Sequence, residues 1–215
     1  MKIAALAACA ALLAGAVPLA QAAAFTNGSF ETVSAVGGEP VCAGGATACI
    51  QYDAGATGIA GWLVEAGSLD VVGSLWVAAD GTRSIDLSGV SAGTLSQTFD
   101  TTIGSTYQVS FQISGNFFGG PATKTATASA GGVVLALSFD ASASTAASMG
   151  WQQQSFSFTA LSDTTTLRFV SGTNSNAGMA LDNVQVTAVP EPQTWALWSA
   201  GLAALLAVRR RRSAS

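Results

Sequence analysis

The chain has 215 residues, of which 49% are hydrophobic and only 9% are charged, and it contains no histidine. A charged fraction far below the roughly 25% of ordinary soluble proteins argues against a cytosolic enzyme surface. The absence of histidine excludes Ser-His-Asp and Cys-His catalysis and every metal site that needs imidazole. Between Phe25 and Val189, three cationic residues stand against eleven acidic ones, a net charge of −8. A domain this acidic repels polyanions, so we expect no nucleic-acid partner.

Residues 1–24 have the pattern of a secretory signal peptide. Lys2 supplies the positive charge, an apolar stretch covers residues 3–20, and small residues follow it. This order is typical of a leader that is removed after export, so we expect the Sec export machinery as a partner. Cleavage after Ala22 and cleavage after Ala24 both fit the pattern.

The C-terminus combines an apolar run with a cluster of positive charge. The run extends from Trp195 to Val208 and is followed by Arg209, Arg210, Arg211 and Arg212. Fourteen helical residues reach about 21 Å, short of a ~30 Å hydrocarbon core, but snorkelling arginines would let the helix just cross. Because arginines stay on the cytoplasmic side, the preceding domain is expected outside.

Pro190, Glu191 and Pro192 stand directly before this apolar run. With the arginine cluster, the segment 189–212 resembles the PEP-CTERM sorting signal of certain Gram-negative bacteria. The resemblance implies an exosortase that recognises the tripeptide and processes the protein, much as analogous tails are removed elsewhere. It also implies a transient inner-membrane intermediate and a final place at the cell surface or in the extracellular matrix.

The region 25–188 alternates apolar and polar residues repeatedly, which predicts half-buried β-strands. No stretch of ten residues in it has a convincing helical stripe. About ten short strands in this length favour an all-β sandwich of jelly-roll type. The expected strands are 25–33, 69–72, 94–100, 107–113, 124–129, 133–139, 156–159, 167–169 and 179–187.

Two further features bear on local structure. Asp80-Gly81 stands between residues 76–78 and 84–87, which predicts a tight hairpin there. Cys42 and Cys49 remain after leader removal, and two cysteines seven apart in an exported chain predict a disulfide.

Several short blocks in the body occur in a recognisable order. They are Asn27-Gly28-Ser29-Phe30-Glu31, Gly61-Trp62, Trp76 with Ala78-Ala79-Asp80-Gly81, Asp86-Leu87-Ser88-Gly89, Ser114-Gly115-Asn116, Met149-Gly150-Trp151 and Leu181-Asp182-Asn183-Val184. Together they resemble the choice-of-anchor C family, which is related to the DUF642 group. The resemblance implies a galactose-binding-like jelly-roll β-sandwich that binds a ligand and has no catalytic activity.

Glu31 and Asp182 fall in the expected first and last strands. Similar segments in jelly-roll carbohydrate-binding modules lie side by side and hold a structural calcium ion, for which carboxylate oxygens are suitable ligands. The alternative is that the two carboxylates, and Asn27 near them, make ordinary turn hydrogen bonds. No cofactor is otherwise required.

Three tryptophans are candidates for a sugar-stacking surface. Trp62 and Trp151 begin apolar strands, which favours the core for both. Trp76 lies beside the expected hairpin and is the better surface candidate. Its possible hydroxyl-binding neighbours are Asp80, Arg83 and Asn116.

The sequence thus predicts an exported, non-catalytic surface or matrix protein that binds extracellular polysaccharide. One alternative is a purely structural matrix protein that associates with its own copies. A weaker alternative is a glycoside hydrolase, which needs two carboxyl groups about 5–9 Å apart. The available carboxyl groups are those of Glu65, Asp70, Asp80, Asp86 and Asp140.

Overall fold

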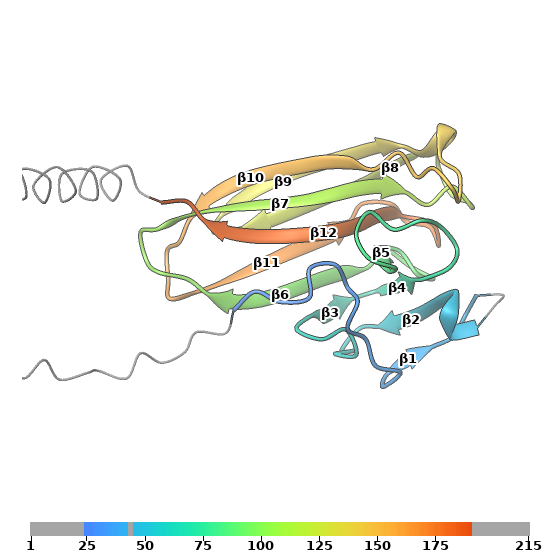
Figure 1. The fold of residues 1–215 in the computed structure, drawn as a ribbon, viewed down its shortest axis with the longest axis horizontal. Coiled ribbons are helices and arrows are strands. Elements are labelled where there is room, and N and C mark those ends of the chain that lie inside the picture. Colours follow the sequence, from blue (N-terminus) through green and yellow to red (C-terminus); the bar gives the residue numbers. More distant parts are fainter. Residues whose placement is uncertain (1–23, 43–44, 191–215) are drawn as a thin grey trace, which may run out of the picture.

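The computed structural model describes residues 24–42 and 45–190, and these form two β-sheets that stack face to face (Figure 1). The seven-stranded sheet has the order β1 (Gly38–Glu39), β2 (Cys49–Asp53), β4 (Ser68–Val72), β5 (Ser84–Asp86), β12 (Met179–Ala188), β7 (Thr106–Gly115), β10 (Gln152–Thr159). The five-stranded sheet has the order β3 (Leu63–Ala66), β6 (Thr94–Asp100), β11 (Thr164–Ser171), β8 (Thr123–Ala130), β9 (Val133–Asp140). Two 3-10 turns, η1 (Gly45–Thr47) and η2 (Ala141–Ala143), complete the elements.

The last eight strands give the fold its topology. β5, β12, β7 and β10 are neighbours in one sheet, and β6, β11, β8 and β9 are neighbours in the other. Most connections therefore cross between the sheets, and β8–β9 is a hairpin within one of them. This is the arrangement of an eight-stranded jelly roll, so the predicted all-β jelly-roll sandwich is confirmed.

The core lies between the two sheets and follows the predicted alternation. Val109, Phe111 and Ile113 of β7 are buried, whereas the residues between them face away from this core. Phe111 meets Phe169 of β11 edge to face, with ring centroids 5.1 Å apart. Such edge-to-face pairs are a favoured aromatic geometry, and this one ties the two sheets together.

Two local predictions were wrong. Residues 25–33 form no strand among the described residues apart from an isolated bridge between Val33 and Ile59. Asp80 and Gly81 lie in the long loop 73–83, which joins the hydrogen-bonded neighbours β4 and β5 and is no tight hairpin. In both places the backbone is held by tertiary contacts that a short sequence pattern does not contain.

The apolar strand at 133–139 is present as β9, but it lies at the edge of its sheet. Its exposure alternates, so that Val134 is 67% exposed and Phe139 is buried. A continuous apolar run was therefore compatible with an edge strand whose outer face meets solvent.

Most of the expected leader 1–24, together with Glu191, Pro192 and the four arginines, lies outside the described residues. Within 24–42 and 45–190, no helix has the length and apolar character needed to cross a membrane.

The predicted disulfide between Cys42 and Cys49 is present, with 5.5 Å between the Cα atoms.

Reduction of this disulfide should lower the free energy of unfolding by about 2–3 kcal/mol, because the reduced unfolded chain gains conformational freedom. Urea unfolding with and without reductant measures this change. The Cys42→Ser/Cys49→Ser variant is the control and should unfold at the midpoint of the reduced protein in both buffers. An unchanged midpoint on reduction would contradict the expectation.

Candidate functional site

The outer face of the seven-stranded sheet carries an unusual row of polar side chains. On β2, β4 and β5 every second side chain points into the main core, as those of Ile50, Leu69 and Ile85 do. Gln51 pairs with Asp70, and Asp70 pairs with Asp86, so these side chains face outward together across three strands. Side chains directly opposite in neighbouring strands have Cβ atoms about 4.5–5.5 Å apart.

Loop 73–83 folds back over this outer face. It places Trp76, which is only 4% exposed, in a second small core with Val72, Met149 and Ala180. The indole Nε1 of Trp76 donates to Ser84 Oγ at 2.8 Å. The expectation that Trp76 lies on the surface was therefore wrong, because a hairpin was assumed where the loop packs inward.

Of the other two tryptophans, both of which were predicted in the core, one is buried and the other is half-buried. Trp62 is buried in the main core, as expected, and its Nε1 donates to the Asn27 backbone oxygen. Trp151 is only half-buried at the margin of the second core, and its Nε1 donates to Val77 O at 3.0 Å.

Glu31 and Asp182 anchor loop 73–83 from two sides. Glu31 Oε1 accepts from the backbone N–H groups of Thr82 and Arg83, each at 2.7 Å. Asp182 Oδ2 accepts from the N–H groups of Ala79 and Asp80 at 2.8 and 2.9 Å. These are the turn hydrogen bonds of the alternative interpretation, and the two carboxylates hold neighbouring parts of one loop.

The environments of the two carboxyl groups differ. Burial opposes ionisation of Glu31, but the hydrogen bonds from Thr82 and Arg83 outweigh it and lower the pKa of Glu31. Burial dominates at Asp182 and raises its pKa to about 7, against the hydrogen bonds from Asp80, Asn183 and Ala79.

A calcium site at Glu31 and Asp182 meets an obstacle in this geometry. The groups that face their oxygens are N–H and O–H donors, whereas calcium needs six to eight oxygen ligands. In the described part of the chain, no group of three or more Asp, Glu, Cys or His residues has metal-binding geometry. Asn27 is also engaged, because its side-chain amide bonds Thr32 and Ala60. The donor set therefore does not fit a calcium ion as it stands.

A buried network surrounds Asp86 on the same sheet face. Asp86 is fully buried, accepts from the N–H groups of Ser88 and Gly178, and receives the Asn116 side-chain amide at 2.7 Å. Burial nonetheless raises the pKa of Asp86 to about 7. Lys124 is equally buried, and burial lowers its pKa while the Asp86 carboxylate opposes that shift.

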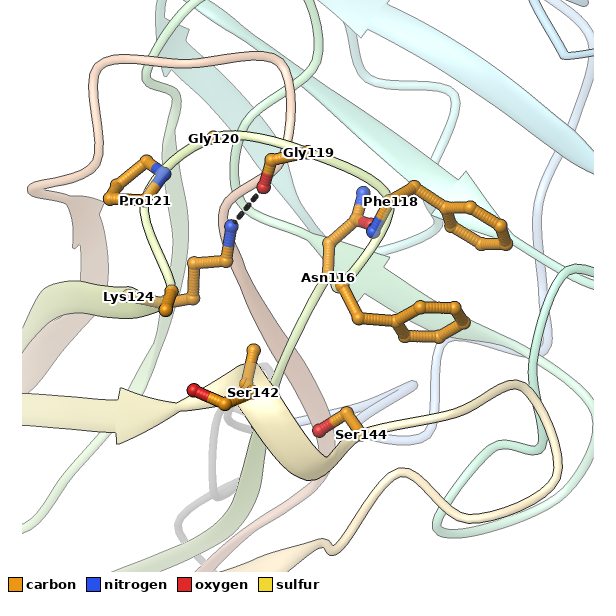
Figure 2. Close-up of a pocket in the computed structure, with 11 residues that line it drawn as sticks. Asn116, Phe118, Gly119, Gly120, Pro121, Lys124, Ser142 and Ser144 are labelled. Carbon is orange, nitrogen blue, oxygen red and sulfur yellow. Dashed lines mark hydrogen bonds between the residues drawn. The ribbon is translucent and has the colours of Figure 1, made fainter.

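This network fixes the loop that follows β7, residues 116–122. Lys124 Nζ reaches beneath the loop and donates to the backbone oxygens of Gly119 and Ala177 at 2.6 and 2.8 Å (Figure 2). Asn116 Oδ1 accepts from the Phe118 N–H at 2.8 Å. The buried pair thus sets the position of Phe118. Behind the loop lies a cavity of about 310 Å³.

On the other side of loop 116–122 is a larger cavity of about 400 Å³, here called the outer-face pocket. The ring of Phe118, which is 60% exposed, stacks roughly parallel to Trp76 with a centroid distance of 6.5 Å. The polar side of the outer-face pocket is formed by Gln51, Asp70, Asn116 and Asn176. Its apolar residues include Val41, Val72 and Val90. A concave, mostly apolar surface with a few convergent polar groups is the usual form of a small-ligand site.

Asp70 differs from the other carboxyl groups on this sheet face. Within the described residues, its Oδ1 is the one buried side-chain oxygen or nitrogen atom without a hydrogen-bond partner. Burial, and then the charge of Asp53, raise the pKa of Asp70 to about 6. A buried acceptor with no donor costs free energy, and such groups concentrate at functional sites.

The pocket contains two of the four residues proposed from sequence for ligand binding. Trp76 and Asn116 line it, but Asn116 is engaged with Asp86 and Phe118 and so acts as a positioning residue. Asp80 is exposed on loop 73–83, and Arg83 borders a separate cavity of about 320 Å³. These two residues are not brought to the pocket.

Sequence reasoning missed Phe118, Gln51 and the role of Lys124. Phe117 and Phe118 precede Gly119-Gly120-Pro121, and a pair of aromatic residues directly before a turn was the available signal. Gln51 and Lys124 gave no such signal. Only the strand register places Gln51 in the pocket and Lys124 beneath loop 116–122.

Asp70 and Asp86 are the carboxyl pair nearest to a glycosidase arrangement, since they are direct cross-strand partners. Asp86, however, is fully buried, and its oxygens are occupied by three N–H donors. An acid that substrate cannot reach cannot protonate a leaving group, so this pair does not support hydrolysis.

Raised pKa values at Asp70 and Asp86 make stability depend on pH. Between the unfolded pKa near 4 and folded values of about 6 and 7, the folded chain binds more protons than the unfolded chain. Stability should therefore be highest near pH 4, fall as pH rises to about 7, and level off above it. Urea midpoints at several pH values measure this trend.

Asp70→Asn provides the matched test, because it removes one of the three carboxyl groups whose pKa is raised by burial, the others being Asp86 and Asp182. The variant should be more stable than the parent at pH 7.5 and nearly equal to it at pH 4. Asp163→Asn, which changes an exposed residue, is the control and should leave the pH profile unchanged. A parent midpoint that rises between pH 4.5 and 7.5 would refute the assignment.

Comparison with known proteins gives two matches to protein families. Residues 23–187 match the family described as "Protein of unknown function (DUF642)", and residues 188–212 match the PEP-CTERM protein-sorting motif. A curated relative is halomucin from Haloquadratum walsbyi (strain DSM 16790 / HBSQ001), 33% identical over 142 residues. That match covers 65% of this chain but only 2% of the length of halomucin.

Among solved structures, a structure titled "CBM4 structure and function" is 15% identical, with a TM-score of 0.42, covering 77% of this chain and 100% of that one. The CBM22-1 xylan-binding domain from Paenibacillus barcinonensis is 15% identical, with a TM-score of 0.43 and coverages of 66% and 94%. A family 35 carbohydrate binding module from Clostridium thermocellum is 12% identical, with a TM-score of 0.41 and coverages of 66% and 92%. Likeness at this level carries no information on what this chain binds.

The sorting motif indicates an exported or cell-surface protein that is processed by an exosortase. The DUF642 match covers most of the chain and includes every residue of the outer-face pocket. The chain therefore belongs to the DUF642 family and carries a C-terminal PEP-CTERM sorting signal.

Proposed function

We propose that this chain is a non-catalytic, surface-displayed protein that binds extracellular polysaccharide in the outer-face pocket. The observation that carries the proposal is the combination of an exposed Phe118 ring, stacked on the buried Trp76, with a carboxylate that lacks a donor, in one cavity of about 400 Å³. The faces of a pyranose ring present C–H groups to aromatic rings, while its hydroxyl groups supply hydrogen-bond donors. Trp76 and Phe118 would serve the first need, and Asp70 and Gln51 the second.

The position of the pocket in the sandwich agrees with this role. Val189 N–H donates to Thr106 O at 2.8 Å, so the chain leaves the sandwich beside the start of β7. That ten-residue strand runs toward the right of Figure 1, and Phe118 comes three residues after its last residue, Gly115. A strand of this length spans about 33 Å. The pocket therefore lies at the end opposite to the side from which the chain continues to the sorting motif.

The finer placement is part of the same proposal. A leader directs export through the Sec machinery, the apolar C-terminal run holds the chain transiently in the inner membrane of a Gram-negative cell, and exosortase processing leads to the cell surface or matrix. In that setting a domain that holds polysaccharide would attach the protein to its surroundings.

Self-association is a second candidate, because the two outer strands of the jelly roll are long and nearly uncharged. β9 and β10 are each eight residues long and lie at sheet edges, and Asp140 is the one charged residue in them. Edges without charge are able to pair with a second copy. A structural matrix protein would use them in this way.

Phe118→Ala should weaken binding of a soluble oligosaccharide that the parent binds by about tenfold or more, which corresponds to about 1.4 kcal/mol. Phe118 is 60% exposed, so its removal should leave the fold intact. Leu161→Ala is the control, because Leu161 is 77% exposed and lies in the turn between β10 and β11. Calorimetric titration of the full chain, in a detergent without a sugar headgroup, measures both variants.

Two results would count against binding at this pocket. One is equal affinity of the parent and Phe118→Ala for every oligosaccharide that binds. The other is concentration-dependent assembly in analytical ultracentrifugation with no oligosaccharide bound at all, which would favour the structural candidate.

Calcium at Glu31 and Asp182 has a separate test. Because these carboxylates are occupied by donors, about 1 mM calcium, the range of weak extracellular sites, should leave the melting temperature unchanged. Magnesium at the same concentration controls for ionic strength. A rise in the melting temperature with calcium alone, lost in Glu31→Gln, would restore the calcium site predicted from sequence.

A further inference from the structure

We propose that the outer-face pocket selects sugars that carry a free, protonated amine, such as β-linked glucosamine units, over neutral and anionic sugars. This inference rests on the proposed function, because it names the class of ligand for the same pocket.

The first support is the unsatisfied charge of Asp70. Three other carboxyl groups around this sheet face, those of Glu31, Asp86 and Asp182, each accept at least three hydrogen bonds from N–H or O–H donors. Asp70 lines the cavity, and its Oδ1 is buried with no donor. Burial and the Asp53 charge raise the pKa of Asp70 to about 6, so the group is charged at neutral pH. A cation in the pocket would compensate a charge that the protein leaves uncompensated.

The second support is the negative charge of the residues around the pocket. Asp53 and Asp86 both interact with Asp70 as like charges, from the two neighbouring strands. None of the described residues that line the pocket is Lys or Arg. Lys124 lies on the far side of loop 116–122, bound to two backbone oxygens. The potential in the cavity is therefore negative, which opposes uronic acids and sulfated sugars and favours a cation.

The third support is the aromatic wall. A cation within about 6 Å of a ring face is attracted by the ring quadrupole, most strongly for Trp. Phe118, which is 60% exposed, presents its ring at the cavity, and the buried Trp76 stacks against it. An amine-bearing pyranose offers both parts that this wall and Asp70 recognise, namely a C–H face and an ammonium group. A neutral hydroxyl group offers Asp70 a hydrogen bond but leaves its charge in place, whereas an ammonium group donates a hydrogen bond and also neutralises that charge.

The test uses four tetrasaccharides that differ mainly in one substituent. Cellotetraose carries a hydroxyl group at C2, the chitin tetramer carries an acetamide there, and the fully deacetylated tetramer carries an amine; tetragalacturonate supplies the anionic case. The full chain is titrated calorimetrically at pH 7 and about 0.15 M salt, where charges more than about 8 Å apart are largely screened. We expect the amine tetramer to bind at least tenfold more tightly than cellotetraose, and tetragalacturonate not to bind.

Asp70→Asn should abolish this tenfold preference, so that the amine tetramer and cellotetraose bind the variant with affinities within about twofold of each other. Asp163→Asn removes the same charge from an exposed turn outside the pocket and should keep the preference. Circular dichroism and urea midpoints establish that both variants are folded. A third variant, Asp70→Glu, keeps a carboxylate at this position and should therefore retain part of the preference that Asp70→Asn loses.

The outcomes separate this inference from the proposed function. Equal binding of cellotetraose and the amine tetramer, both lost in Phe118→Ala, would overturn the amine selectivity and leave polysaccharide binding standing. A preference that falls equally in Asp70→Asn and Asp163→Asn would also overturn it, because the effect would then come from overall charge. No binding of any tetramer would overturn both.

Discussion

The structure depends on how buried carboxylates on one sheet face are provided with hydrogen-bond donors. The middle strands of the seven-stranded sheet are covered on both sides, by the second sheet and by loops. Asp86 and Asp182 are fully buried on the loop side. An ionised or polar group in such a place is tolerated only when donors surround it. The loops supply those donors, and their conformations follow from this need.

The two loops that carry the aromatic wall of the outer-face pocket are tied down by these groups. Glu31 and Asp182 hold the backbone of loop 73–83, and that loop brings Trp76 onto the sheet. Asp86 holds Asn116, and Asn116 with Lys124 holds the turn that carries Phe118. The aromatic wall is thus rigid because buried polar groups position it, which lowers the ordering cost of binding a ligand.

Asp70 is the exception on this sheet face, and the proposed binding site depends on it. It lies in register between Gln51 and Asp86, yet no loop reaches it with a donor, and the cavity lies beside it. A protein selected for stability alone gains from replacing such a group, so its presence is typical of a binding site that trades stability for recognition. The strand β7 places this site at the opposite end from the departure of the chain toward its sorting motif, so a tethered molecule would present the pocket outward.

The sequence by itself determined most strands of the body from β4 onward, the disulfide and the family. Alternation in β7 and β11 has a period of two whatever their neighbours are, and a short cysteine spacing in an exported chain leaves little choice of partner. The sorting signal is likewise a continuous sequence pattern, so it is recognised by a match of residues 188–212 to the motif. These features are local, so no knowledge of distant contacts was needed for them.

Only the tertiary structure decided which side chains share the pocket. Gln51, Asp70, Trp76 and Phe118 come from two strands and two loops, and cross-strand register and loop packing bring them together. Trp76 was predicted at the surface because Asp80-Gly81 is a common hairpin signal, but the donors needed by Asp182 and Glu31 draw that segment over the sheet instead. The site depends on long-range hydrogen bonds between residues as many as 103 positions apart, and short sequence patterns do not encode such pairings.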